Sequence, residues 1–369
     1  AGPPAPIGET ATAADRPGGH GYLLAGLGVG LCFVLVVLLY QMTYELPLPF
    51  DNRVLPVLAA ALLGLAGTGV RPGPTPADAE PAPRPGAHEP NAEERDEKRA
   101  RRGRFAPLAG VPAVLLLVPV LMLVTSPSPA PTGTDGDALR LVTWNLHYGV
   151  NNEAAVDPGT ISGVLRAQHP DVILLQEVDR GWAIGGGTDL VEWLSRSLAM
   201  PYVWSPAADG QFGNVILSSL PISDVRTGQL PYGAGPQHRS YASAKVELTS
   251  GQKLRVMTAH LQDHTDNHAT RLAEINTLLG HWGHDNPAVI AGDFNAMPGW
   301  SEIRRFDRAG LVSAQDAGGH GGMLTSPTDR PRYRPDWIFG TDDVSFRDFA
   351  RPRSQASDHF PLVVTVDLG

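Results

Sequence analysis

Residues 291–295 read Ala-Gly-Asp-Phe-Asn and close an apolar run that delivers a carboxylate and an amide two residues apart. Side chains alternate across a strand, so a strand over 288–295 places Asp293 and Asn295 on one face and Phe294 in the packing on the other. A hard divalent cation, or a water that attacks phosphorus, fits between such side chains. The stretch therefore predicts a buried strand that ends in a polar site.

Around this strand, the region 139–369 alternates apolar runs with amphipathic ones. Asp157 and Pro158 form a good N-cap and first-turn pair for a helix that ends near Gln168. Apolar residues between Leu272 and Trp282 recur at helical spacing. Strands mixed with helices in this way predict two packed sheets covered by helices. The expected strands are 141–145, 171–176, 212–217, 240–248, 253–260, 288–295, 336–339 and 361–366.

Polar and ionisable residues stand at the ends of six of these segments. Taken singly, a Glu or Asn at a strand end is more often a cap, and a lone His is more often a hydrogen-bonded structural residue. Because separate segments converge where strands end, we expect all six to meet at one cleft. The residues are Asn145, Glu177, His260, Asp293, Asn295, Asp336, Asp358 and His359.

The order of these segments resembles the endonuclease/exonuclease/phosphatase superfamily. The resemblance is carried most specifically by Gly-Asp-Phe-Asn at 292–295 and Ser-Asp-His at 357–359, and it spans 139–369. It implies an α/β (α+β) catalytic domain built as a four-layer αββα sandwich. It also implies an enzyme, a hydrolase of phosphoric ester bonds that uses Mg²⁺, or Mn²⁺, to direct the attack of water on phosphorus.

The resemblance also implies roles for residues in the cleft. Glu177 is then the principal metal ligand, with Asn145 beside it and Asp358 near the metal. Asp293 orients or deprotonates the attacking water. Asn295 holds a phosphate oxygen.

Two histidines and two further residues complete the implied site. Asp336 steadies His359 as a His–Asp pair, and His260 stabilises the transition state or helps the leaving group depart. Asn214 and Arg239 resemble the family less sharply. They are substrate-binding candidates, Arg239 as a bidentate clamp on a phosphate oxygen. Their alternatives are a turn-forming Asn and a solvated Arg.

The residue types fit this chemistry independently of the family. Phosphoryl transfer requires oxygen ligands for a hard metal and neutral or cationic donors around phosphate. A zinc site is disfavoured because His260 and His359 are far apart and no cysteine pair supports them. A Ser-His-Asp hydrolase is disfavoured because Ser357 has no Gly-x-Ser-x-Gly elbow. Pro335 stands where the family usually has isoleucine, which leaves the aim of Asp336 open.

The first third of the chain is of a different kind. Uncharged apolar runs at 22–40, 54–70 and 107–124 predict three transmembrane helices. A cleaved signal peptide is the alternative for the first run. We therefore expect a disordered tail over 1–20 and a membrane anchor over 21–125.

The distribution of charged residues in the loops predicts which side of the membrane each loop faces. The loop 71–105 holds a cluster of Arg and Lys, so it is expected to face the cytoplasm, and its interspersed acidic residues make it a solvated segment. A flexible linker over 126–138, rich in Ser, Pro, Thr and Gly, then leads to the catalytic domain. The protein is thus expected to be a multi-pass cell-membrane protein with 139–369 extracytoplasmic. This plan resembles bacterial membrane proteins of the VanJ type.

The expected substrate follows from this location. A linker of about a dozen residues reaches at most roughly 40 Å, which keeps the cleft near lipid-linked phosphate. The region 139–369 holds 19 Lys and Arg against 25 Asp and Glu, a net charge near −6, which does not favour long-range attraction to a polyanion. The alternative is a cell-surface nuclease for external DNA or RNA, with Trp182, Trp204 and Tyr241 along a groove. A catalytically dead binding module is the third hypothesis. No obligate protein partner is inferred, and the single cysteine, Cys32, excludes a disulfide framework in the catalytic domain.

Overall fold

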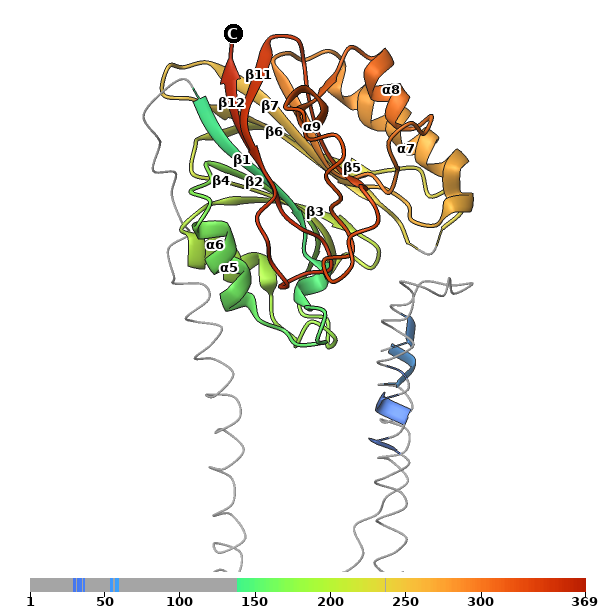
Figure 1. Ribbon diagram of the computed structural model, residues 1–369. Helices are drawn as coiled ribbons and strands as arrows, with labels where there is room; N and C mark the ends of the chain where they lie inside the picture. Colours follow the sequence, from blue (N-terminus) through green and yellow to red (C-terminus); the bar gives the residue numbers. More distant parts are fainter. Residues whose placement is uncertain are drawn as a thin grey trace, which may run out of the picture. The chain divides into compact units, whose positions relative to one another are not determined.

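Two six-stranded sheets lie face to face between helices in a computed structural model of the protein (Figure 1). This is the mixed α/β two-sheet sandwich that the sequence predicts. The described residues are 29–30, 32–34, 36, 54–55, 57–59, 138–235 and 237–369.

The first sheet has the strand order β11-β12-β1-β2-β4-β3. Only β1 and β2 run parallel, so their carboxyl ends meet at one edge of the sheet. Strand β12 runs antiparallel to β1, and its start therefore lies at that same edge. The strands are β1 (Ala138–Asn145), β2 (Val172–Asp179), β3 (Tyr202–Ala207), β4 (Phe212–Ser218), β11 (Val344–Ala350) and β12 (Leu362–Leu368).

The second sheet has the order β5-β6-β7-β8-β10-β9. Here β7 and β8 are the parallel pair, and β10 runs antiparallel to β8 with Asp336 opposite Asp293. The carboxyl ends of β7 and β8 and the start of β10 thus share one edge. The strands are β5 (Ile222–Gln229), β6 (Ser240–Glu247), β7 (Lys253–His260), β8 (Ala288–Asp293), β9 (Val312–Ser313) and β10 (Asp336–Gly340).

Helices cover the outer faces of both sheets (Figure 1). Ile161 of α5 and Leu194 of α6 pack on the first sheet, and Ile275 of α7 and Phe306 of α8 pack on the second. Asp157 caps α5 by accepting from the Thr160 N–H, as its position before Pro158 predicts. The helices are α5 (Pro158–Arg166), α6 (Leu190–Leu198), α7 (His268–Trp282), α8 (Ile303–Arg308) and α9 (Ala314–Ala317), with 3₁₀ turns η3 (His147–Gly149) and η4 (Thr265–Asn267).

The core between the sheets follows from the two-residue period of the strands. In β2, Leu174 faces the second sheet while Leu175 faces the helices α5 and α6. In β7, Val256 faces the first sheet while Met257 faces α7. Every residue of β2 is buried, and its first half, 172–175, reads as a continuous apolar run.

Gly292 lets the two central strands of the second sheet approach each other. A Cβ atom on Gly292, whose φ is +153°, would lie 2.1 Å from the carbonyl oxygen of Ala259. No side chain fits at that distance, so the glycine before Asp293 fixes how closely β8 lies beside β7. The glycine of the Gly-Asp-Phe-Asn motif is therefore a packing requirement beside the site.

Several elements differ from the sequence prediction. The strands β3, β5, β9 and β11 and the helices α6, α8 and α9 were not predicted. The strand predicted over 288–295 ends at Asp293, because Asn295 has a φ of +47° and leaves the strand. The strand predicted to end at Gln176 continues to Asp179 through a bulge between Leu175 and Val178.

Only parts of the predicted membrane anchor are described. Residues 29–30, 32–34 and 36 of the first apolar run, and 54–55 and 57–59 of the second, are helical. No helix within the described residues is long and apolar enough to span a bilayer. The third predicted span, the loop 71–105, the tail 1–20 and the linker up to residue 137 lie outside the described residues.

Candidate active site

The six predicted segments meet where the two sheets place their strand ends side by side. Asn145 ends β1, His260 ends β7 and Asp293 ends β8. Asp336 begins β10, and His359 comes shortly before β12. The sandwich therefore brings residues up to about two hundred positions apart into one buried cluster, as expected for a cleft built on strand ends.

Glu177 points into the cluster because of a β-bulge, which the alternation of side chains along a regular strand does not predict. It lies in the bulge of β2 and has a φ of +50°, in the left-handed region that costs energy for a residue with a side chain. Asn295, on the turn after β8, has a φ of +47°. Strained backbone of this kind concentrates at functional sites, because the surrounding fold must hold it in place.

Two carboxylates converge on the amide of Asn145. Its Nδ2 donates to Glu177 Oε1 at 3.1 Å and to Asp293 Oδ2 at 2.9 Å, while its Oδ1 accepts from the backbone N–H of His147 at 3.0 Å. All three side chains are buried. The amide nitrogen, not the oxygen, thus faces the carboxylates, so Asn145 acts here as the group that holds Glu177 and Asp293 together.

His260 stands on one side of Asp293. Its Nε2 lies 3.7 Å from Asp293 Oδ2 and 3.7 Å from Glu177 Oε1. Arg239 Nη1 lies 3.0 Å from the Nδ1 of His260, and Asn295 Nδ2 lies 3.1 Å from its Nε2. Burial, followed by the positive charges of Arg239 and His359, holds the pKa of His260 well below its ordinary value of 6.5.

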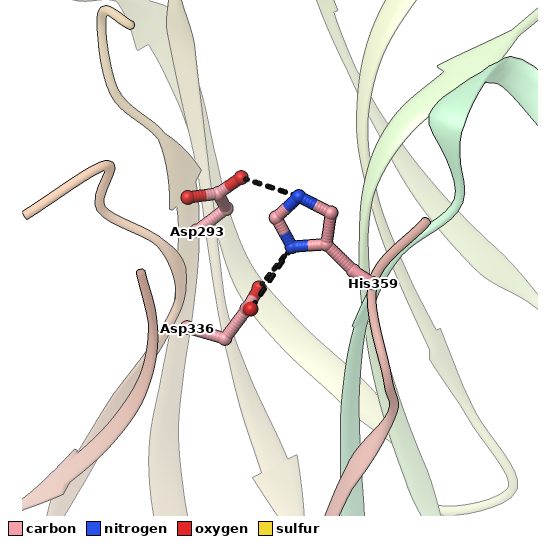
Figure 2. Close-up of side chains that lie close together, drawn as sticks. All are labelled: Asp293, Asp336 and His359. Carbon is pink, nitrogen blue, oxygen red and sulfur yellow. Dashed lines mark hydrogen bonds and ion pairs between the residues drawn. The ribbon is translucent and has the colours of Figure 1, made fainter. Parts of the chain in front are cut away.

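His359 stands on the other side of Asp293, and Figure 2 shows it between two carboxylates. Its Nδ1 lies 2.9 Å from Asp336 Oδ2, and its Nε2 lies 3.7 Å from Asp293 Oδ2. Burial alone lowers the pKa of His359, but the carboxylates of Asp336 and Asp293 outweigh it and hold that pKa well above 6.5. The predicted His–Asp pair is therefore formed, and Pro335 does not turn Asp336 away.

Asp293 is shared by all these contacts. Burial raises the pKa of its carboxyl to about 7, against the lowering effect of His359. Its Oδ1 accepts from the backbone N–H of Asn295 at 2.9 Å, which explains why Asn295 is beside it although it has left the strand. A carboxyl with a pKa near neutrality is suited to accept a proton from water.

The cluster has the charge and the donor types that a divalent cation requires. Glu177, Asp293 and Asp336 bring three buried carboxylates together against the one imidazolium of His359. Asp293, Asp336 and His359 also offer ligand atoms within 4.8 Å of one another. Because Asp336 already holds a proton on His359, we assign these two to the His–Asp pair. Glu177 is then the carboxylate that fits a hard cation, with Asp293 beside it to accept a proton.

Of the three other predicted residues, Asn214 and Asp358 lie outside this cluster of contacts, and Arg239 lies against it. Asn214 is buried in β4, where its Nδ2 donates to Ser240 O at 2.8 Å, so the structure gives it a role between the sheets. Asp358 Oδ1 lies 3.9 Å from Nδ1 of His147 and is partly exposed. Arg239, which is predicted as a phosphate clamp, is buried, and its Nη1 lies 3.0 Å from Nδ1 of His260.

The aromatic groove expected for a nuclease is not formed by the residues proposed for it. Trp182 and Tyr241 are buried, and Tyr241 stacks on His281 of α7, on the outer face of the second sheet. Trp204 is partly buried and lies beside Arg180. These side chains therefore pack in the fold.

Residues that support the His–Asp pair were missed from the sequence. Thr325 Oγ1 donates to Asp336 Oδ2, Trp144 Nε1 donates to the backbone oxygen of His359 at 2.7 Å, and Ser357 Oγ donates to that of Asn145 at 2.7 Å. Trp144 and Ser357 are adjacent to motif residues, which is a usable signal. Thr325 lies in an irregular segment, and nothing in the sequence places it there.

Comparison with known proteins agrees with this geometry. Residues 142–359 match the model of the Endonuclease/Exonuclease/phosphatase family. A UPF0294 protein of Vibrio parahaemolyticus is 25% identical over 252 residues, which cover 63% of this chain and 79% of that protein.

Two solved structures are similar in fold. An endonuclease/exonuclease/phosphatase from Beutenbergia cavernae has a TM-score of 0.56 and 23% identity, with 63% of this chain and 72% of that chain covered. The TDP2 of D. rerio, complexed with a single strand DNA product, has a TM-score of 0.51 and 20% identity, with 63% and 100% covered. At these identities the likeness supports the αββα fold, and the chemistry is argued from the site.

Proposed function

Because the chain belongs to the endonuclease/exonuclease/phosphatase family, we propose that it is a metal-dependent phosphoesterase that hydrolyses a phosphodiester or phosphoanhydride of a lipid-linked or phospholipid substrate. The observation that carries the reaction class is the position of Asp293, which contacts Asn145 and lies 3.7 Å from both His260 and His359. A buried carboxylate between two histidines can aim a water at a phosphate held by them.

Each residue then has a task in the reaction. Asp293 accepts the proton of the attacking water, for which a pKa near 7 is suitable. His359, held in its charged form by Asp336, donates from Nε2 to the phosphate and stabilises the negative charge that develops there. His260 and Asn295 donate to the phosphate from the opposite side.

The metal has a defined place in this proposal. Glu177 would hold it, and Asn145 keeps the carboxylate of Glu177 next to that of Asp293. When bound, Mg²⁺ or Mn²⁺ supplies a Lewis acid that neutralises charge on the phosphate. Asp358 is proposed to lie near this metal, as the family resemblance implies.

The lipid substrate rests on the sequence of the first third of the chain. The apolar runs at 22–40, 54–70 and 107–124 support a multi-pass membrane anchor of the VanJ type. The basic loop 71–105 supports a cytoplasmic loop, with the domain 139–369 extracytoplasmic. An enzyme held at that surface meets lipid-linked phosphate at high local concentration.

A nuclease that acts on external DNA or RNA is the second candidate. It is favoured by the similarity in fold to TDP2, whose structure contains a DNA product. It is disfavoured by the burial of Trp182 and Tyr241 and by the excess of acidic residues in the chain.

The test compares three substrates with the purified full chain. Plasmid DNA, a chromogenic phosphodiester and a polyprenyl pyrophosphate are each incubated with Mg²⁺ or with EDTA. We expect Mg²⁺-dependent hydrolysis of the chromogen and of the lipid, with DNA cleaved far more slowly. DNA cleavage far faster than lipid hydrolysis would replace the lipid proposal by the nuclease. No hydrolysis of any substrate, with an Asp293→Ala variant that behaves like the parent, would leave a binding module.

A further inference from the structure

We propose that Arg239 is a positioning residue that fixes the ring proton of His260 on Nε2. Arg239 Nη1 lies 3.0 Å from His260 Nδ1, and both side chains are buried. A guanidinium has five N–H donors and no acceptor, and it stays charged at every accessible pH. The contact is a hydrogen bond only if Nδ1 accepts, which leaves Nε2 as the nitrogen that carries the proton.

The contacts of Arg239 hold its guanidinium against the ring of His260. Arg239 lies in the connection between β5 and β6, with 1% of its surface exposed, and Nη1 also lies 3.3 Å from Oε1 of Gln237. Of these two contacts the shorter is the one with His260, so Arg239 is placed to act through that ring.

The consequence for catalysis, which rests on the proposed function, concerns the space in front of Nε2. Asn295 Nδ2 lies 3.1 Å from Nε2 of His260 and donates to the backbone oxygen of Leu261 at 3.0 Å. That bond keeps the amide nitrogen, not the oxygen, toward His260, so with the proton on Nε2 the 3.1 Å contact joins two donors and is not a hydrogen bond between them. The carboxylates of Glu177 and Asp293, each 3.7 Å from Nε2, favour the proton on that nitrogen. Two neighbouring N–H donors then flank the same position.

A negatively charged oxygen is the partner that two such donors select. A phosphate oxygen that accepts from both Nε2–H of His260 and Nδ2–H of Asn295 is stabilised as charge grows on it during attack. With the proton on Nδ1, the same nitrogen of His260 would present a lone pair to that oxygen and repel it. Arg239 thus decides whether this side of the cleft attracts or repels phosphate.

The position of the proton is measured directly by ¹⁵N NMR of the histidine rings in the full chain, in EDTA, with His260 assigned through a His260→Gln variant. In the parent we expect Nε2 of His260 to be protonated and Nδ1 to be an unprotonated acceptor. Arg239→Met keeps an unbranched side chain but removes the donor, and it should give a mixture of tautomers. Arg239→Lys keeps a charged donor and should restore the parent tautomer.

The kinetic readout separates positioning from substrate binding. On the chromogenic phosphodiester, Arg239→Met should lower kcat about ten- to a hundredfold with KM changed by less than about threefold, and Arg239→Lys should recover most of kcat. Arg255→Met is the matched control. Arg255 is an equally buried arginine of β7 that pairs with Asp285, and its loss should not alter the His260 tautomer.

Several results would overturn the assignment. A parent spectrum with the proton on Nδ1 does so, and so does an Arg239→Met variant that keeps the pure Nε2–H tautomer. If Arg239→Met does not fold, the parent and Arg239→Lys spectra decide. An inactive parent chain with the Nε2–H tautomer refutes the proposed function but supports the role of Arg239 in setting the tautomer.

Discussion

The two histidines beside Asp293 occupy similar positions and have opposite electrostatic surroundings. Each has its Nε2 3.7 Å from Asp293 Oδ2, and each is buried. His260 receives a cation, Arg239, at its Nδ1, whereas His359 receives a carboxylate, Asp336. The group that contacts Nδ1 therefore decides whether the Nε2 that faces Asp293 belongs to a neutral ring or to an imidazolium.

This difference in charge gives the two histidines different roles in the cleft. A neutral His260 donates one hydrogen bond without neutralising either Glu177, whose charge is kept for a cation, or Asp293, which accepts the proton of water. A charged His359 brings a full positive charge to the phosphate. The pairs come from different layers, Arg239 and His260 from the second sheet and its connections, and His359 from the segment before β12 of the first sheet.

Removal of the carboxylate between the histidines should have the largest effect. Asp293→Asn keeps the shape but cannot accept a proton, and we expect kcat/KM to fall about a thousandfold. The measurement is Mg²⁺-dependent hydrolysis of the chromogenic phosphodiester. Circular dichroism should show the parent fold. Asp316→Asn is a control on a partly exposed carboxylate paired with Arg334 outside the cluster, and activity close to that of the parent is expected. A fully active Asp293→Asn variant would remove Asp293 from the chemistry.

The next largest effect should come from the His359 side. Asp336→Asn removes the charge that raises the pKa of His359, so that pKa should fall and kcat should drop about a hundredfold at pH 7.5. In the parent, a folded-state pKa above 6.5 stabilises the fold below pH 6.5, and this contribution is lost as pH rises through the raised pKa. NMR titration of His359 checks the shift. An unchanged pKa of His359 in the variant would contradict the claim that Asp336 makes the two histidines differ in charge.

A smaller effect is expected at Asp358. Its carboxylate is partly exposed and lies 3.9 Å from Nδ1 of His147, so Asp358→Asn should lower kcat by less than about tenfold. The concentration of Mg²⁺ needed for half-maximal activity is measured in parallel. A rise in that concentration would support the place near the metal that the family resemblance implies. A loss as large as that of Asp293→Asn would mean that the cleft extends to Asp358.

The smallest effect is expected at Glu274, which holds the backbone just after His260 in place. Glu274 of α7 accepts from the backbone N–H of Gln262 at 2.9 Å, and burial raises its pKa from 4.5 to about 8. Its ionisation therefore opposes folding, and the parent should lose stability as pH rises from 4.5 to about 8. Glu274→Gln should remove this loss and be more stable than the parent at pH 8 by roughly 1–2 kcal/mol. Denaturant unfolding at pH 5 and pH 8 measures it, and equal pH slopes in both proteins would refute it.

Much of the fold was predictable because its central strands are buried on both faces and are mainly apolar. The strands β1, β7 and β8 were predicted to within a few residues for that reason. Strand β5, at an edge, was missed because its exposed residues, such as Val225 and Arg226, carry no apolar period. The helix α6 has an apolar face at Leu190 and Leu194 that the sequence pattern could have revealed.

The sequence predicted which residues form the site better than it predicted the contacts between them. Side chains at strand ends identified Asp293, His260 and His359, since strand order brings such ends together. The role of Arg239 was not predictable, because an Arg in a loop is usually solvated, and only the packed structure shows its guanidinium against His260. The bulge at Glu177 was likewise invisible, because a strand with one extra residue has an ordinary apolar pattern.

Metal-dependent hydrolysis of a phosphodiester is the measurement that tests the central claim most directly. The full chain is stripped with EDTA, assayed on the chromogenic phosphodiester, and assayed again after excess Mg²⁺ is added, with Asp293→Asn treated in the same way. The account predicts no turnover without metal, recovery with Mg²⁺ in the parent and no recovery in the variant. Turnover that is unchanged by EDTA, or equal in the parent and the variant, would contradict it.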